Sequence, residues 1–142
     1  MLSAKLFGAL CAIVFVVAIL GHYGILPFSP MGIALSGIAY GPLYWQTFAA
    51  IVCAALALSY VGIARTATHP PNRLVGIASF ALVALALFTM IVESFVSDRL
   101  FQRFESMIWI FFAAMFAFLV GVVLSALNLA WAVFRQALPA SN

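Results

Sequence analysis

The fold of this chain is decided by residues 107–134, MIWIFFAAMFAFLVGVVLSALNLAWAVF, a stretch without a charged residue or a proline. With a rise of about 1.5 Å per residue, a helix of this length exceeds the thickness of the hydrocarbon core of a membrane, about 30 Å. Three more apolar runs, 6–26, 43–64 and 74–96, also lack proline, and Glu93 is the only charged residue inside them. The sequence therefore predicts four transmembrane helices.

The composition indicates that lipid, rather than water, surrounds most side chains. Hydrophobic residues make up 68% of the 142 residues and charged residues only 6%, whereas a soluble domain carries roughly 25% charged residues. Backbone groups in lipid must be paired within the protein, and the runs are far longer than a transmembrane strand of about 10 residues. We therefore predict an all-α integral membrane protein, an antiparallel bundle of four transmembrane helices that forms a single membrane domain over residues 1–142.

The connection between the first two runs is long and contains no Asp, Glu, Lys or Arg. Ser29 followed by Pro30 is a typical helix start, because the hydroxyl can cap the first turn and proline suits its first position. Gly41 before a proline is a typical helix end. We expect a short interfacial helix over Met31–Tyr40; an apolar loop folded over the bundle is the alternative.

Orientation follows from the basic residues, because cytoplasmic loops of membrane proteins are enriched in Lys and Arg. Four basic residues fall on the side of both termini, and two fall on the other side together with all the acidic residues. The first group is Lys5, Arg65, Arg73 and Arg135, and the second is Arg99 and Arg103 with Glu93, Asp98 and Glu105. We predict a location in the inner (cell) membrane with both termini cytoplasmic.

The beginning of the chain resembles a secretory signal peptide, with Lys5 followed by the apolar stretch 6–20. Cleavage needs a site of the A-x-A type, and Leu20 stands where a second small residue would have to follow Ala18. We expect this segment to be retained as the first transmembrane helix.

Two histidines could bind a cofactor. His22 ends the first span and His69 lies in a connection on the opposite side, so one chain cannot supply both axial ligands of a haem. His22 is a candidate for binding a cofactor together with a partner chain, and an interfacial histidine without such a role is the simpler interpretation. No cofactor or metal site is otherwise evident in the sequence.

Glu93 lies near the outer end of the third run. An ionisable side chain is costly to place in a membrane and is often functional there. The charged residues that follow indicate that Glu93 sits at the level of the lipid headgroups. We expect an ion pair with Arg99 or Arg103; uptake of a proton from the outer water is the alternative.

The fourth run contains small residues at every fourth position, and an asparagine continues the same side. These residues are Ala113, Ala117, Gly121, Ser125 and Asn128. At 100° per residue, Ala114 and Ala132 share one helix face with Ala117, Gly121 and Asn128. Small side chains let helix backbones approach closely, and asparagine can form a hydrogen bond across the contact. The pattern predicts a helix-packing or partner face, and the sequence leaves open whether the neighbour belongs to this chain or to another.

The motifs of several enzyme classes are missing: no phosphate-binding loop, nucleophile elbow, paired-cysteine motif or zinc-protease motif is present. The basic residues form no cluster typical of nucleic-acid binding. We expect a non-catalytic accessory or scaffolding subunit of a larger respiratory, photosynthetic, oxygenase or transport complex. Its partners would be the lipid bilayer and other transmembrane subunits. A small homo-oligomeric transporter or channel is the alternative, and an enzyme subunit that borrows a cofactor site through His22 is a third interpretation.

Overall fold

The computed structural model describes the backbone of most of the chain. The described ranges are 1–23, 43–67, 69–95 and 104–137, with side chains at 1–20, 23, 46–67, 69–92 and 109–135. All the regular structure in these ranges is helical. The helices are α1 (Leu2–His22), α3 (Leu43–Thr66), α4 (Arg73–Phe95) and α5 (Phe104–Ala137).

Each of the four helices contains a segment long and apolar enough to cross a membrane, which confirms the four predicted helical runs. These segments are Leu2–Leu20, Gln46–Thr66, Arg73–Val92 and Trp109–Arg135. The helix bounds extend beyond the predicted spans, most clearly at the starts of α1 and α5. The helix α1 begins at Leu2, ahead of Lys5, and the exposed lysine can extend its amine away from the apolar surface. The helix α5 begins at Phe104, so it starts before the uncharged stretch.

Some predicted features lie outside the described residues. The expected interfacial helix over Met31–Tyr40 is one of them, and so is the end of the first predicted span beyond Tyr23. Both stay predictions.

The start of α4 is fixed by a capping asparagine. The side-chain Oδ1 of Asn72 accepts hydrogen bonds from the backbone N–H groups of Leu74 at 2.9 Å and Val75 at 3.4 Å. An asparagine in this position satisfies N–H groups that have no acceptor within the helix. Pro70 and Pro71 stand just before it and prevent α3 from continuing.

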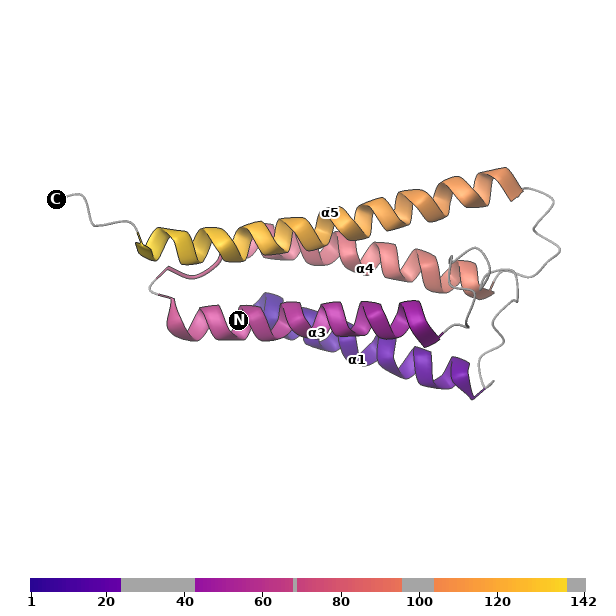
Figure 1. Ribbon diagram of the computed structural model, residues 1–142, viewed down its shortest axis with the longest axis horizontal. Helices are drawn as coiled ribbons and strands as arrows, with labels where there is room; N and C mark the ends of the chain where they lie inside the picture. The colour runs from indigo at the N-terminus through magenta and orange to yellow at the C-terminus, as the bar shows by residue number, and fades with distance from the viewer. Residues whose placement is uncertain (24–42, 68, 96–103, 138–142) are drawn as a thin grey trace.

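Figure 1 shows the four helices side by side along the long axis of the molecule. The most extensive contacts are between α1 and α3 and between α4 and α5, while the contacts of α1 with α4 and of α3 with α5 are much smaller. The molecule therefore consists of two closely packed helix pairs, α1 with α3 and α4 with α5. The contact between the two pairs is less extensive.

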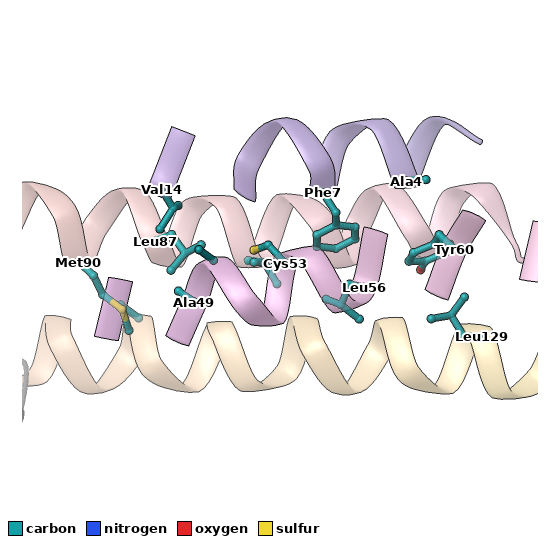
Figure 2. Packing of buried hydrophobic residues seen from close by; sticks show 13 residues of the cluster. Ala4, Phe7, Val14, Ala49, Cys53, Leu56, Tyr60, Leu87, Met90 and Leu129 are labelled. Atoms are coloured by element: carbon teal, nitrogen blue, oxygen red, sulfur yellow. The ribbon is translucent and has the colours of Figure 1, made fainter. Parts of the chain in front are cut away.

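Aromatic contacts join the first helix pair to α4 near one end of the molecule. Phe7 of α1 is fully buried, and its ring stacks on Tyr60 of α3 with centroids 5.9 Å apart. The same ring meets Phe80 of α4 edge to face, with centroids 5.5 Å apart. Figure 2 shows Phe7 and Tyr60 in the row of buried side chains that continues toward Val14 and Leu87. The beginning of α1 and the end of α3 thus lie against the first part of α4.

Candidate functional site

The main polar cluster of the described residues is centred on Asn128 of α5, whose side chain is only 6% exposed. Its Oδ1 accepts a hydrogen bond from the backbone N–H of Asn72 at 2.9 Å. Its Nδ2 donates to the backbone C=O of Asn72 at 2.9 Å and to the hydroxyl of Tyr60 at 3.2 Å. Both amide donors and the amide oxygen are therefore paired. One side chain joins α5 to the start of α4 and to α3.

A second buried polar contact lies one turn earlier on α5. The hydroxyl of Ser125 donates to Oγ of Ser79 on α4 at 2.9 Å, and the hydroxyl of Ser79 donates to the backbone C=O of Gly76 at 3.1 Å. Both serine side chains are fully buried. Hydrogen bonds in such a chain polarise each other, and in an apolar environment leaving either hydroxyl unpaired would be costly.

Gly121 lies where α5 closely approaches α4. A Cβ atom at this position would lie 2.7 Å from Cγ2 of Val83, 2.9 Å from the backbone oxygen of Ser79 and 3.2 Å from Cβ of Leu82. Because two of these distances are shorter than real Cβ contacts, no larger residue fits without displacing α4. The absence of a side chain at Gly121 lets the serine pair form one turn further along.

The predicted packing face of α5 is only partly the face that the structure buries. Gly121, Ser125 and Asn128 are buried, and the contacts above direct them at α4 of the same chain. Ala117 is half-buried and Ala113 is exposed. A row of every fourth residue turns by about 40° per step around a helix, so its first member faces another direction from its last. Ala114 and Ala132, which the helical wheel placed on the same face as Gly121 and Asn128, are buried at 6% and 3% exposed.

The remaining candidates of the sequence analysis fall at the edges of the described structure. His22 is the last residue of α1, and Glu93 lies near the end of α4, but their side chains are outside the described set. Arg99 and Arg103 lie outside the described residues altogether. The expected ion pairs and the role of His22 therefore stay predictions. Within the described residues, no group of three or more His, Cys, Asp or Glu side chains comes together.

Gln46, in the first turn of α3, is a residue that the sequence analysis missed. Its side chain is fully buried, and among the described residues neither Nε2 nor Oε1 has a hydrogen-bond partner. A buried amide without partners is destabilising by about 1–3 kcal/mol for each lost interaction. A signal was present in the sequence, since Gln46 and Asn128 are the only amide side chains inside the four predicted spans. One of the two is fully paired and the other is not.

Comparison with protein-family models, with curated proteins and with solved structures finds no match for this chain. Amides and hydroxyls form hydrogen bonds but are not the usual general acids and bases of catalysis. The arrangement around Asn128 is suited to holding helices in register.

Proposed function

We propose that this chain is a multi-pass protein of the inner (cell) membrane and a non-catalytic accessory or scaffolding subunit of a larger membrane complex. In this proposal the four helices form an antiparallel bundle with both termini in the cytoplasm. The contacts of Tyr60, Asn72 and Asn128 support that arrangement, because they bring the end of α3, the start of α4 and the later part of α5 together. The basic residues Lys5 and Arg73, at the starts of α1 and α4, support the cytoplasmic assignment of this end.

The observation that carries the subunit proposal is an open apolar groove between α3 and α5. The groove has a volume of about 520 Å³ and is lined by Ser59, Ile63, Ala126, Leu129, Ala130, Val133 and Phe134. Ser59, Ala126 and Ala130 are small and exposed. Transmembrane helices associate through such surfaces because small residues let the backbones come close. We propose that a transmembrane helix of a partner subunit packs into this groove.

The outer face of α5 extends the same surface. Large apolar side chains that are at least half exposed repeat at helical spacing along it: Phe112, Phe116, Leu119, Val123, Leu127, Trp131 and Phe134. Residues three and four apart share one side of a helix, so these side chains form one continuous stripe. A partner helix in the groove would lie alongside this stripe.

The proposal is tested by filling the groove without touching the interior of the molecule. Ala130→Leu adds bulk in the groove, and Ala113→Leu is the matched control, because Ala113 is also an exposed alanine of α5 but does not line the groove. Each variant is purified in mild detergent, and the proteins that come with it are identified and quantified. We expect unrelated subunits to co-purify with the wild type and the control and to be lost from Ala130→Leu.

Other outcomes separate the alternatives. Association of the wild type with copies of itself, lost in Ala130→Leu, would favour the homo-oligomeric transporter or channel. A coloured preparation would favour the borrowed cofactor site. Equal retention of partners by both variants would show that the groove faces lipid, and the proposed docking surface would be wrong.

A further inference from the structure

A second hollow lies at the end of the molecule where the polar cluster is found, on the side of α1. It is a cavity of about 320 Å³ between the start of α1, the end of α3 and the connection that leads into α4. Its lining residues are Met1, Leu2, Ser3, Tyr60, Ala64, Pro70, Pro71 and Arg73. Most of the wall is apolar, and its polar side chains are those of Ser3, Tyr60 and Arg73.

Two hydroxyl groups in this wall have hydrogen-bonding capacity to spare. Ser3 is 7% exposed, and its hydroxyl has no hydrogen bond to any described residue. Tyr60 is 4% exposed; its oxygen accepts a hydrogen bond from Asn128, and its own proton has no acceptor among the described residues. Buried hydroxyls are normally paired. A ligand with acceptor atoms would satisfy both of them.

The two hydroxyls are brought together by a glycine. A Cβ atom at Gly76 would overlap the hydroxyl of Ser3 and lie 3.4 Å from the hydroxyl oxygen of Tyr60. Because Gly76 has no side chain, both groups reach the same part of α4. The spare donors from α1 and α3 are therefore close to each other.

The charge around the cavity is positive. Arg73, the first residue of α4, lines it directly. The first backbone hydrogen bond of α1 runs from the N–H of Lys5 to the C=O of Met1, so the N–H groups between them have no acceptor within the helix. A helix start of this kind attracts anions. Ser3 lies in this first turn, is 7% exposed and has no hydrogen bond to a described residue. This buried hydroxyl is a second observation that points to a ligand, separate from the helix start. No acidic residue occurs in the chain before Glu93, so α1, α3 and the connection contain none.

We propose that this cavity binds a phosphate group, with Arg73 as the counter-charge and the hydroxyls of Ser3 and Tyr60 as hydrogen-bond donors. A phosphate has several acceptor oxygens directed at different angles. It can therefore accept hydrogen bonds from donors on three helices that line one cavity. The source is either the headgroup of an anionic phospholipid or free phosphate. The lipid source rests on the proposed membrane insertion, which would place these helix ends at headgroup depth. The phosphate chemistry does not depend on it.

Binding is measured on the purified full chain in detergent by native mass spectrometry, with phosphatidylglycerol or phosphatidylcholine added in separate samples. A third sample receives inorganic phosphate, and its effect on thermal stability is compared with that of chloride. The variants are Arg73→Gln and Ser3→Ala. Arg65→Gln is the matched control, because Arg65 is an exposed arginine at the end of α3 that does not line the cavity.

We expect the wild type to retain phosphatidylglycerol over phosphatidylcholine, and Arg73→Gln to bind it at least about tenfold more weakly, as expected for the loss of a charged hydrogen bond. Ser3→Ala should weaken binding less, and Arg65→Gln should bind like the wild type. Stabilisation by inorganic phosphate, lost in Arg73→Gln, would support the same site with free phosphate as its source.

The proposal is overturned if the wild type prefers neither phosphatidylglycerol nor phosphate. It is also overturned if Arg65→Gln weakens binding as much as Arg73→Gln, since the attraction would then be a general property of the basic surface. Retention of partner subunits by Arg73→Gln is scored in the same preparations. Failure of the anion site therefore leaves the groove proposal untouched, and failure of the groove leaves the anion site untouched.

Discussion

The side chain of Asn128 pairs with the backbone of Asn72, accepting from its N–H and donating to its C=O at 2.9 Å each. The side chain of Asn72 is occupied at the same time in capping α4. One residue therefore both starts a helix and anchors another helix to that start. The two roles make the position of α5 depend on where α4 begins.

Asn128→Leu should destabilise the protein. The substitution removes three hydrogen bonds and leaves polar groups of Asn72 and Tyr60 without their partner. Hydrogen bonds between membrane helices average about 0.6 kcal/mol, and stranded polar groups add to the loss, so we expect about 1–3 kcal/mol in total. Thermal unfolding in detergent measures it, with Leu127→Ala on the exposed side as control. Unchanged stability of Asn128→Leu would mean that lipid or detergent groups replace the amide.

Gly121→Ala should be harmful although the change is a single methyl group. The added atom would lie too close to Val83 and to the backbone of Ser79, and overpacking of this kind costs about 1–3 kcal/mol. Gly62→Ala is the control, since nothing lies within 4 Å of a Cβ there. It should be neutral or stabilising by up to about 1 kcal/mol, because alanine favours the helix. Thermal unfolding of the two variants gives the comparison, and equal behaviour would contradict the close α4–α5 contact.

Gln46→Leu should stabilise the protein. The amide of Gln46 is fully buried without a hydrogen bond, and an apolar side chain of similar size removes that cost, about 1–3 kcal/mol. The midpoint of thermal unfolding should rise. Thr47→Val, at the half-buried neighbouring position, serves as the control. A fall in stability for Gln46→Leu would reveal that the amide has a partner in the membrane.

A single cysteine at position 69 reports the orientation of the chain. His69 is exposed in the connection between α3 and α4, and the basic residues predict that this connection faces the cytoplasm. In a background with Cys11→Ala and Cys53→Ala, His69→Cys should react with an impermeant thiol reagent only after the membrane is opened. Labelling of intact cells from outside would reverse the predicted topology.

The sequence predicted the helices well because their signals are local. Length, hydrophobicity and the position of proline are properties of each segment alone, and all four runs are helical. The contacts between helices were harder to predict. In helices as apolar as these, the outward and the inward faces are both apolar, so the pattern does not show which side is buried. The every-fourth row therefore included Ala113, which is exposed, whereas Ala114, which the helical wheel placed on the same face as Gly121 and Asn128, is buried.

The partners of the buried polar groups could not be read from the sequence either. Asn128 and Ser125 were recognised as members of a contact face, but Asn72, Tyr60 and Ser79 were not, because pairing across helices depends on their relative rotation and depth. Gln46 was missed for the opposite reason. It has no hydrogen-bond partner in the described part of the chain, and no pattern of spacing in a sequence predicts a missing hydrogen bond.

The polar links between the two helix pairs are unevenly distributed along the molecule. In the described part of the chain, the hydrogen bond between the pairs is the one from Asn128 to Tyr60. Tyr60 lies toward the end of α3, whereas Gln46 lies in its first turn. Helices that meet only through apolar side chains can shift against each other without breaking a hydrogen bond. Any relative motion of the two helix pairs should then be small near Tyr60 and largest near Gln46. Thermal fluctuations would separate the helices from the end at Gln46, and amide hydrogen exchange in α3 should become faster toward that residue.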